Sequence, residues 1–202
     1  LADATNSQVN TDAVGSYTVT YSVSDANGNA ADPVTRTVSV VDTTKPVITL
    51  LGNVTETVEA KGTYTDAGAS ASDILDGNLT GSVTSVSTVN TDAVGSYTVT
   101  YNVNDAAGNA ATAVVRTVNV VDTTAPVITL TGDATVTAEG AVTYTDAGAT
   151  ATDSLDGDLT SSTVATSTVD ADKVGSYTVT YSVSDAAGNA ATAVVRTVNV
   201  VD

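Results

Sequence analysis

The sequence predicts an all-β protein built from tandem sandwich modules. One observation behind this prediction is internal repetition: when the 202-residue chain is shifted against itself by 80 residues, Tyr17, Tyr97 and Tyr177 superpose without a gap. The other is that apolar and polar residues alternate with a period of two inside each copy of the repeat. Repetition at a fixed period is typical of modular arrays, and alternation is typical of half-buried strands.

The repeat divides the chain into three parts. Residues 43–122 and 123–202 form two complete copies, whereas residues 1–42 match only the C-terminal half of one. We expect this half copy to supply the last three strands of a module and to expose half of a core. Either upstream residues or another chain would then complete it, and the sequence leaves both possibilities open.

Each complete copy contains enough strand signals for a sandwich of six or seven strands. Tyr97, Val99 and Tyr101 alternate with Thr98 and Thr100, which is the pattern of a strand with one buried face. Gly, Asp and Asn clusters separate the β-rich stretches, at the spacing typical of a sandwich. In the third copy the expected stretches are residues 126–130, 134–140, 143–153, 162–170, 175–185 and 191–202.

One charged residue falls inside a predicted strand. Arg116 shares its parity with Val118 and Val120, so its side chain should point inward unless a bulge near Val114 and Val115 shifts the register. A structural ion pair, or an arginine that reaches the surface along an apolar stem, is favoured here over a binding role.

Composition excludes several classes of function. The chain has 6 basic and 23 acidic residues, a net charge of −17, and no Cys, His, Met, Trp or Phe. It therefore offers no disulfides, no zinc, haem or iron–sulfur site of the usual kind, and no thiol or histidine-dependent catalysis. Its charge would repel nucleic acid and anionic membranes. No apolar run reaches the ~18 residues of a membrane span, so direct membrane insertion is not expected.

A recurring motif carries a family resemblance. DAVGSYTV stands at residues 12–19 and 92–99, and DKVGSYTV at 172–179. The motif resembles the immunoglobulin-like pattern in which an acidic residue and a Gly precede a Tyr, and a core residue follows two positions later. The resemblance implies that Tyr17, Tyr97 and Tyr177 close a corner by donating their hydroxyls to the upstream backbone. The Cys and Trp of antibody domains are absent.

With its DTTAP, YTDAGA, DGDLT and DAAGN segments, the whole repeat resembles the bacterial Ig-like module found in tandem in large surface adhesins and some secreted proteins. The resemblance implies Ig-like sandwiches, a location outside the cell or on the bacterial surface, and a role as a spacer. The short linkers contain Pro, which restricts their conformations. We therefore expect successive modules to stack as an elongated rod.

Acidic and amide side chains cluster in loops that should meet. If strands beginning at Pro126, Val142, Ser161, Gly175 and Thr192 alternate in direction, the DSLDGD and DAAGN loops share an end with the incoming linker. Calcium prefers six to eight oxygen ligands, so the sequence predicts a calcium site at each junction between modules. The candidate ligands are Asp42, Asp73, Asp76, Asn78, Asp105 and Asn109 at the first junction, and Asp122, Asp153, Asp156, Asp158, Asp185 and Asn189 at the second.

Ordinary turn chemistry could also explain these segments. DAAGN makes a good hairpin loop, with its Asp bonding to nearby backbone and its Gly adopting positive φ, and DGD and DGN are common turn sequences. An acidic surface also keeps a protein soluble in saline surroundings. The sequence leaves calcium binding and turn formation open as alternatives.

The resulting function hypothesis is a non-enzymatic stalk or spacer of a bacterial surface adhesin, whose junctions calcium rigidifies. Its partners would be neighbouring modules of the same chain. A first alternative is a subunit of a surface layer or filament that associates with other copies by strand exchange. A second is a module that binds a glycan or a host protein. Two nearly identical copies with small side chains do not suggest the substrate cleft that glycoside chemistry needs.

Overall fold

The computed structural model describes residues 9–202, and nearly all of the regular secondary structure in this range is β-strand. Helical structure in this range is limited to two three-residue 3₁₀ turns, η1 (Thr80–Ser82) and η2 (Thr160–Ser162). By its internal contacts the chain divides into two compact units. The first holds the chain up to Val54 together with Asp66–Thr88 and Thr98–Thr117, and the second holds Thr55–Thr65, Val89–Tyr97 and Val118–Asp202.

The first unit contains a two-stranded sheet and a three-stranded sheet, with order β1-β2 and β3-β5-β6. β7 pairs with β8 in antiparallel fashion, with Ser87 opposite Val99. The strands are β1 (Gly15–Tyr21), β2 (Val34–Val40), β3 (Val47–Leu50), β5 (Ala69–Asp73), β6 (Gly77–Asn78) and β7 (Thr84–Ser87), while β8 (Gly95–Asn102) and β9 (Val114–Val121) contribute residues to both units.

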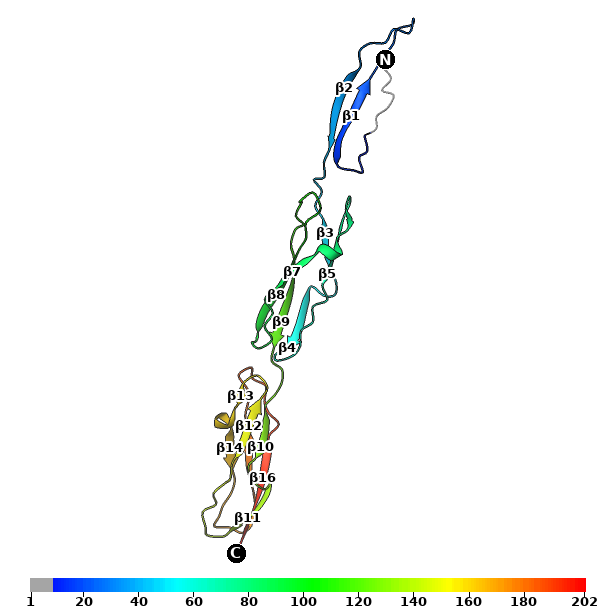
Figure 1. The fold of residues 1–202 in the computed structure, drawn as a ribbon. Coiled ribbons are helices and arrows are strands. Elements are labelled where there is room, and N and C mark those ends of the chain that lie inside the picture. Colours follow the sequence, from blue (N-terminus) through cyan, green and yellow to red (C-terminus); the bar gives the residue numbers. More distant parts are fainter. Residues whose placement is uncertain (1–8) are drawn as a thin grey trace. The chain divides into compact units, whose positions relative to one another are not determined.

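The second unit contains β4 (Thr55–Glu59) and the whole third copy, which forms two sheets with order β10-β12-β13 and β11-β16-β15-β14. β11 runs parallel to β16, and β15 runs antiparallel to it. In the third copy, β13 lies at the end opposite β11 and the C-terminus (Figure 1). The strands are β10 (Val127–Leu130), β11 (Thr135–Glu139), β12 (Ala149–Asp153), β13 (Gly157–Asp158), β14 (Val164–Ser167), β15 (Gly175–Ser182) and β16 (Val194–Val201).

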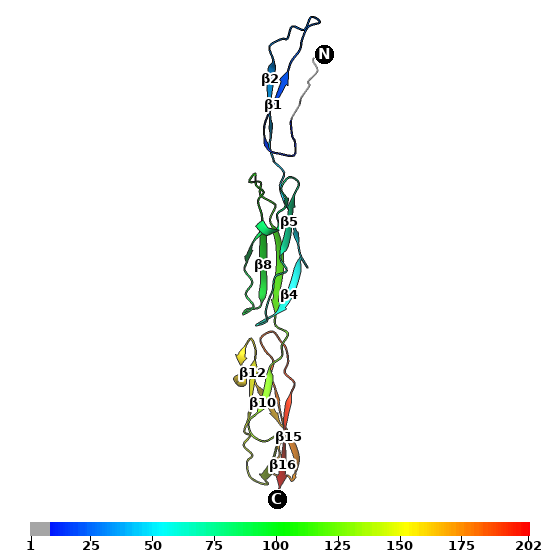
Figure 2. The ribbon, with the colours of Figure 1, turned by 45° about the vertical axis from the view of Figure 1, so that its right-hand side comes forward.

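The predicted alternation produces a thin core between the two sheets of the third copy. Val179 and Tyr181 of β15 and Val198 of β16 are at most 2% exposed, and Ile128 of β10 and Ala151 of β12 face them from the other sheet. Figure 2 shows β10 and β12 beside β15 and β16 from a second direction. The predicted all-β fold with six or seven strands per complete copy is confirmed, since each complete copy has seven, β3–β9 in one and β10–β16 in the other.

Two predicted strand starts in the third copy are wrong. The stretch at 143–153 becomes a strand only from Ala149, because Asp146 accepts a hydrogen bond from Gly148 N at 2.8 Å and Gly148 takes a φ of +84°. This local side-chain turn competes with extended backbone, so Val142 lies in a loop. The strand expected from Ser161 begins at Val164, because η2 occupies the preceding residues.

Arg196 of β16, the counterpart of Arg116, is fully buried, as its parity predicted. Arg196 pairs with Val179 in an uninterrupted register, so no bulge turns it outward. Its guanidinium donates to Asp146 at 2.5 Å and to the carbonyls of Thr131 at 2.5 Å and Asp133 at 3.0 Å. β16 and β11 belong to one sheet and β10 and β12 to the other, and these partners lie in the two connections between the sheets, so the arginine ties the sheets together. The prediction of a structural ion pair is confirmed.

Arg116 has the same environment in the first unit. It is fully buried, forms an ion pair with Asp66, and donates to the Tyr101 hydroxyl at 3.0 Å and to the Asn53 carbonyl at 2.9 Å. The recurrence of every kind of contact in both complete copies indicates that the buried arginine is a fixed part of the module. It supplies a polar tie between sheets where antibody domains have a disulfide.

The corner implied by the family resemblance is present in all three copies. Tyr17, Tyr97 and Tyr177 donate their hydroxyls to the carbonyl oxygens four residues upstream, at 2.9, 2.9 and 3.0 Å. Each bond satisfies a partly covered phenol and fixes the segment that enters the next strand. The tyrosine corner is therefore confirmed.

The half copy differs from the complete ones in the part that the structure describes. β1 and β2 form a two-stranded sheet, Val34 is 67% exposed, and Arg36 is exposed and lies 5.9 Å from the Tyr21 ring centroid. The expected third strand falls partly in residues 1–8, which lie outside the described residues. Completion of this half copy by upstream sequence or by another chain stays a prediction.

Removing the acidic partner of a buried arginine should be strongly destabilising. We expect Asp146→Ala to lower the free energy of unfolding of the third copy by about 3 kcal/mol, because Arg196 is left charged and buried without its partner. Hydrogen exchange of the β16 amides measures the loss. Asp172→Ala, at an exposed acidic residue of the same copy, is the control and should change little. Equal protection in the two variants would contradict a structural role for the pair.

Candidate metal centre

A short loop between β5 and β6 orients the first acidic cluster. Asp73 ends β5, and its Oδ1 accepts hydrogen bonds from Leu75 N at 2.7 Å and Asp76 N at 3.2 Å. Gly77 begins β6 opposite Asp73 with a φ of +72°, a conformation that L side chains rarely adopt. The DILDGN sequence thus folds into a tight turn that fixes one oxygen of Asp73 and leaves the other free to bind.

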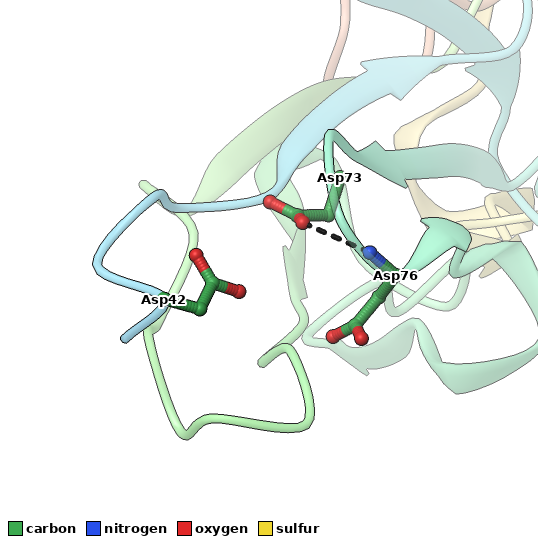
Figure 3. Close-up of side chains that lie close together, drawn as sticks. All are labelled: Asp42, Asp73 and Asp76. Carbon is green, nitrogen blue, oxygen red and sulfur yellow. Dashed lines mark hydrogen bonds between the residues drawn. The ribbon is translucent and has the colours of Figure 1, made fainter. Parts of the chain in front are cut away.

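The linker from the preceding copy brings a third carboxylate to this loop. Asp42 Oδ1 accepts a hydrogen bond from Thr44 N at 3.0 Å, which orients the side chain. One carboxylate oxygen from each of Asp42, Asp73 and Asp76 lies within 4.8 Å of the others. Figure 3 shows the three side chains around one space, with Asp42 from the linker and the other two from the loop.

Two oxygens of this cluster are buried without a partner. Asp42 Oδ2 and Asp73 Oδ2 are inaccessible to solvent and accept no hydrogen bond. Asp73 as a whole is only 8% exposed. Turn chemistry accounts for the Oδ1 atoms but not for these. A buried carboxylate oxygen without a donor costs free energy, so the arrangement favours a cation as its partner.

The DAAGN loop supports the cluster. Both oxygens of the buried Asp105 accept bonds from Asn109, whose Nδ2 also donates to the Asp42 carbonyl oxygen at 3.2 Å. Ala106 N donates to Asp76 Oδ2 at 2.7 Å. Asp105 therefore holds Asn109, and Asn109 holds the linker. In this geometry the DAAGN loop positions the carboxylates. Its two predicted ligands, Asp105 and Asn109, support the cluster through hydrogen bonds.

The second unit repeats the arrangement with Asp122, Asp153 and Asp156, whose oxygens also lie within 4.8 Å of one another. Asp153 Oδ1 accepts from Leu155 N at 2.7 Å and Asp156 N at 3.0 Å. Asp122 Oδ2 and Asp153 Oδ2 are buried without a partner, and Asp122 is 8% exposed. The same device therefore occurs where the linker enters each complete copy.

The supporting loop of the second cluster also matches the first. Asn189 Nδ2 donates to the Asp122 carbonyl oxygen at 3.1 Å and to Asp185 Oδ2 at 2.8 Å, and Ala186 N donates to Asp156 Oδ2 at 2.7 Å. The structure thus brings five of the six residues predicted for each junction into one network. Their role as metal ligands stays a prediction.

Asn78 and Asp158 lie outside these networks. Each is exposed, and its Oδ1 accepts a hydrogen bond from the backbone N–H two residues later, in Thr80 at 3.0 Å and Thr160 at 2.9 Å. Asp158 is not part of the carboxylate cluster. The bond is the turn chemistry that the sequence offered as an alternative, and the ligand role predicted for these two residues stays untested.

The clustered carboxylates differ in acidity. Burial raises the pKa of Asp122, and the negative charges of Asp185, Asp153 and Glu59 add to the effect, although Thr124 N–H opposes it. By contrast, the hydrogen bond from Leu75 N lowers the pKa of Asp73. Burial works against ionisation of Asp185, but the donors of Asn189 outweigh it and lower its pKa. Of these three groups, only Asp122 has a pKa above its ordinary value, so the protein disfavours its negative charge.

Sequence reasoning missed one residue of the second junction. Glu59, at the end of β4, accepts hydrogen bonds from Thr123 and Thr124, the residues that follow Asp122 in the linker. A signal was present, because an 80-residue shift places Glu59 on Glu139. A recurring acidic residue at a strand end was not distinguished from ordinary surface charge.

Comparison with known proteins identifies the module. Residues 4–40, 48–120 and 128–200 match the family described as bacterial surface protein, Ig-like domain. The chain belongs to this family of bacterial surface Ig-like domains. The three matches lie in the half copy and the two complete copies of the repeat. No curated protein searched matches the chain. In residues 9–202, no helix has the length and hydropathy required to cross a lipid bilayer.

Solved structures similar to this Ig-like chain include multidomain proteins. The M60 catalytic domain with the CBM51-1 and CBM51-2 domains of Clostridium perfringens ZmpB is 17% identical over 97% of this chain and 34% of that one, with a TM-score of 0.43. Domains 4–9 of the surface layer protein SbsC are 16% identical over 93% of this chain and 35% of that one, with a TM-score of 0.30. The Ig-like chain thus spans about a third of each. At these scores they add no argument about function.

The raised pKa of Asp122 predicts a pH-dependent effect of removing its charge. In the presence of a chelator, Asp122→Asn should stabilise the Ig-like chain at neutral pH, because wild-type folding there must bury an ionised carboxylate. As the pH falls through the raised pKa, folded Asp122 takes up a proton and the penalty disappears. Below the ordinary value of 3.8, both states are protonated and no difference remains from this group.

Urea unfolding of both proteins across this pH range measures the difference. Asp158→Asn is the control, because hydrogen bonds from Thr160 lower the pKa of Asp158 and the second copy has Asn78 at the same place. The control should be neutral or slightly destabilising at neutral pH. A wild type more stable than Asp122→Asn throughout would contradict the prediction.

Proposed function

We propose that this Ig-like chain is a non-enzymatic extracellular spacer of a bacterial surface protein, and that calcium ions fix each linker to the copy that follows it. The observation that carries the calcium part is that buried Asp73 and Asp122 each have one unpartnered carboxylate oxygen beside two other carboxylates. Membership of the family supports the surface location. The end-to-end rod expected from the short linkers stays a prediction.

Electrostatics explains why a divalent cation would matter. Two carboxylates about 4 Å apart repel each other by about 1 kcal/mol in water, and by about 4 kcal/mol at the lower effective dielectric constant near a protein surface. Each cluster brings three together, with no lysine or arginine in either supporting network. A divalent cation would turn this repulsion into attraction. Since the ligands come from two copies, it would also link them.

Calcium fits this set of donors better than other common metals do. Soft nitrogen and sulfur ligands are unavailable in a chain without His or Cys. Calcium accepts carboxylate and carbonyl oxygens in flexible geometry at about 2.3–2.6 Å and tolerates water in the remaining positions, whereas magnesium demands nearly ideal octahedral geometry at shorter distances. Three carboxylates on a linker and a loop, held by backbone bonds, suit the more tolerant ion.

The same donors argue against catalysis. Hydrolysis by paired acids needs one carboxyl group that donates a proton and one that stays ionised on opposite sides of a substrate. Here one oxygen from each carboxylate lies within 4.8 Å of the others, and backbone donors of the same loop or of the DAAGN loop hold them. Such an arrangement concentrates negative charge at one point, which suits holding a cation.

Calcium should stabilise the folded chain. We expect millimolar calcium to raise the midpoint of thermal unfolding, and a chelator to lower it, because an ion that binds only the folded state adds stability by linkage. Calorimetry with calcium, with magnesium and with chelator measures the effect, and calcium should have the largest one. Coincident traces with calcium and with chelator would remove the calcium part of the proposal and leave the spacer.

Removing one charge from the second cluster should be neutral or stabilising without calcium and unfavourable with it. Without metal, Asp153→Asn relieves repulsion and should leave the chain as stable as wild type or more stable. With calcium it loses a ligand and should lower the apparent affinity of that site by roughly tenfold, the effect of about 1.4 kcal/mol. Asp158→Asn is the matched control and should bind calcium like wild type. Equal affinity of Asp153→Asn and wild type would contradict the assignment of this cluster.

A further inference from the structure

Glu59 holds the linker that follows its own copy. Its Oε1 accepts hydrogen bonds from Thr123 N at 2.8 Å, Thr124 N at 3.1 Å and Thr124 Oγ1 at 2.8 Å, and its Oε2 accepts one from Thr123 Oγ1 at 2.8 Å. One carboxylate therefore binds both backbone and side chains of two consecutive residues. So many donors on one half-buried acid make a specific site, in contrast to a chance surface contact.

The linker is held on both sides at this point. Thr123 and Thr124 directly follow Asp122, whose carbonyl oxygen accepts a bond from Asn189 of the third copy at 3.1 Å. Ala60, next to Glu59, donates its N–H to the Val121 carbonyl at 2.7 Å, just before Asp122. β4 therefore fixes residues on each side of Asp122, and the DAAGN loop of the following copy fixes Asp122 itself.

We propose that Glu59 is a positioning residue that clamps this linker in the absence of metal, and that it presents Asp122 to the second carboxylate cluster. The clamp itself stands on the four hydrogen bonds of Glu59, and only its effect on calcium affinity rests on the proposed function. In this clamp a glutamate carboxylate accepts hydrogen bonds from the backbone N–H and the hydroxyl groups of two consecutive threonines. Glu59 touches no ion; it acts through the linker.

The chain contains one internal comparison for this role. Glu139 is the counterpart of Glu59 in the third copy, at the same position of the repeat. Within residues 9–202 the Glu139 side chain accepts no hydrogen bond, so Glu139 is a matched acid that holds no Thr-Thr pair there.

Charge adds to the geometric effect. Bonds from Thr123 N–H and from the threonine hydroxyls lower the pKa of Glu59, so its carboxylate stays ionised near Asp122. The negative charge of Glu59 in turn disfavours the ionised form of Asp122. With a cation present, the same charge attracts the ion. Glu59 therefore strains the metal-free cluster slightly and should strengthen cation binding.

The test compares Glu59→Gln with Glu139→Gln in the whole 202-residue chain. Amide hydrogen exchange of Thr123 and Thr124 is followed in chelator, and calcium binding to each cluster is followed by NMR titration of the Asp73 and Asp153 amides. Gln keeps the size of the side chain but loses the charge and one acceptor oxygen. We expect exchange at the two threonine amides to rise about fivefold in Glu59→Gln and to stay unchanged in Glu139→Gln.

The calcium arm should separate the two clusters. Glu59→Gln should weaken calcium binding at the second cluster several-fold and leave the first unchanged. Unchanged threonine exchange in Glu59→Gln overturns the clamp, whatever calcium does. Faster exchange without any calcium binding in the wild type supports the clamp and overturns the calcium part of the proposed function together with the affinity effect. Calcium binding that Glu59→Gln leaves unchanged at both clusters overturns the positioning role.

Discussion

A buried arginine held by an aspartate and several carbonyl groups is the interaction on which each complete copy depends. Its core contains small side chains, and no disulfide or tryptophan strengthens it. Arg196 extends from β16 to the loops before β11 and β12, so that one side chain ties the two sheets. All three nitrogens of the guanidinium donate hydrogen bonds, and a buried charge is tolerated only when it is paired and hydrogen-bonded in this way. The arginine also fixes the loop that delays the start of β12.

This tie fixes the position of one sheet relative to the other, and it thereby fixes the positions of the loops at their ends. The incoming linker and the β12–β13 loop come from distant parts of the sequence, yet the carboxylates of Asp122, Asp153 and Asp156 approach within 4.8 Å of one another. The DAAGN loop supports them through hydrogen bonds from Asn189 and Ala186. Backbone donors fix one oxygen of Asp153 and one of Asp122, and the other oxygen of each stays without a donor. Three like charges held together in this way store repulsion that a cation would relieve.

The two clusters share the same pattern of three carboxylates, and the linker that enters the second one is held by two copies. At the second, Glu59 of the preceding copy and Asn189 of the following one hold consecutive linker residues. Rigidity at this joint therefore has a hydrogen-bonded contribution that needs no metal, to which ion binding would add. Because Glu59 also carries charge, it adds to the rise in the pKa of Asp122, and under the proposed function the same charge would attract the cation.

Most of the fold could be predicted from the chain alone. Repetition gave the module, alternation gave the buried faces of β15 and β16, and parity placed Arg116 and Arg196 inside, because strand side chains point alternately to the two faces of a sheet. The start of β12 could not be predicted, since Asp146 forms a local turn that competes with extended backbone. The sequence of a turn such as DGD does not show whether its carboxylates lie close to carboxylates of another segment.

The sequence by itself determined the period, most of the strands and the aspartates near each linker, because these follow from local patterns, and its resemblance to Ig-like domains implied the tyrosine corner. Only the tertiary structure decided which oxygens keep a donor and which do not: Asp158 is satisfied by its own turn, whereas Asp122 and Asp153 each keep a buried oxygen without one. It also decided that Glu59 grips the linker, since that contact joins residues 64 positions apart. Such pairings depend on how strands from distant segments align, which no local pattern encodes.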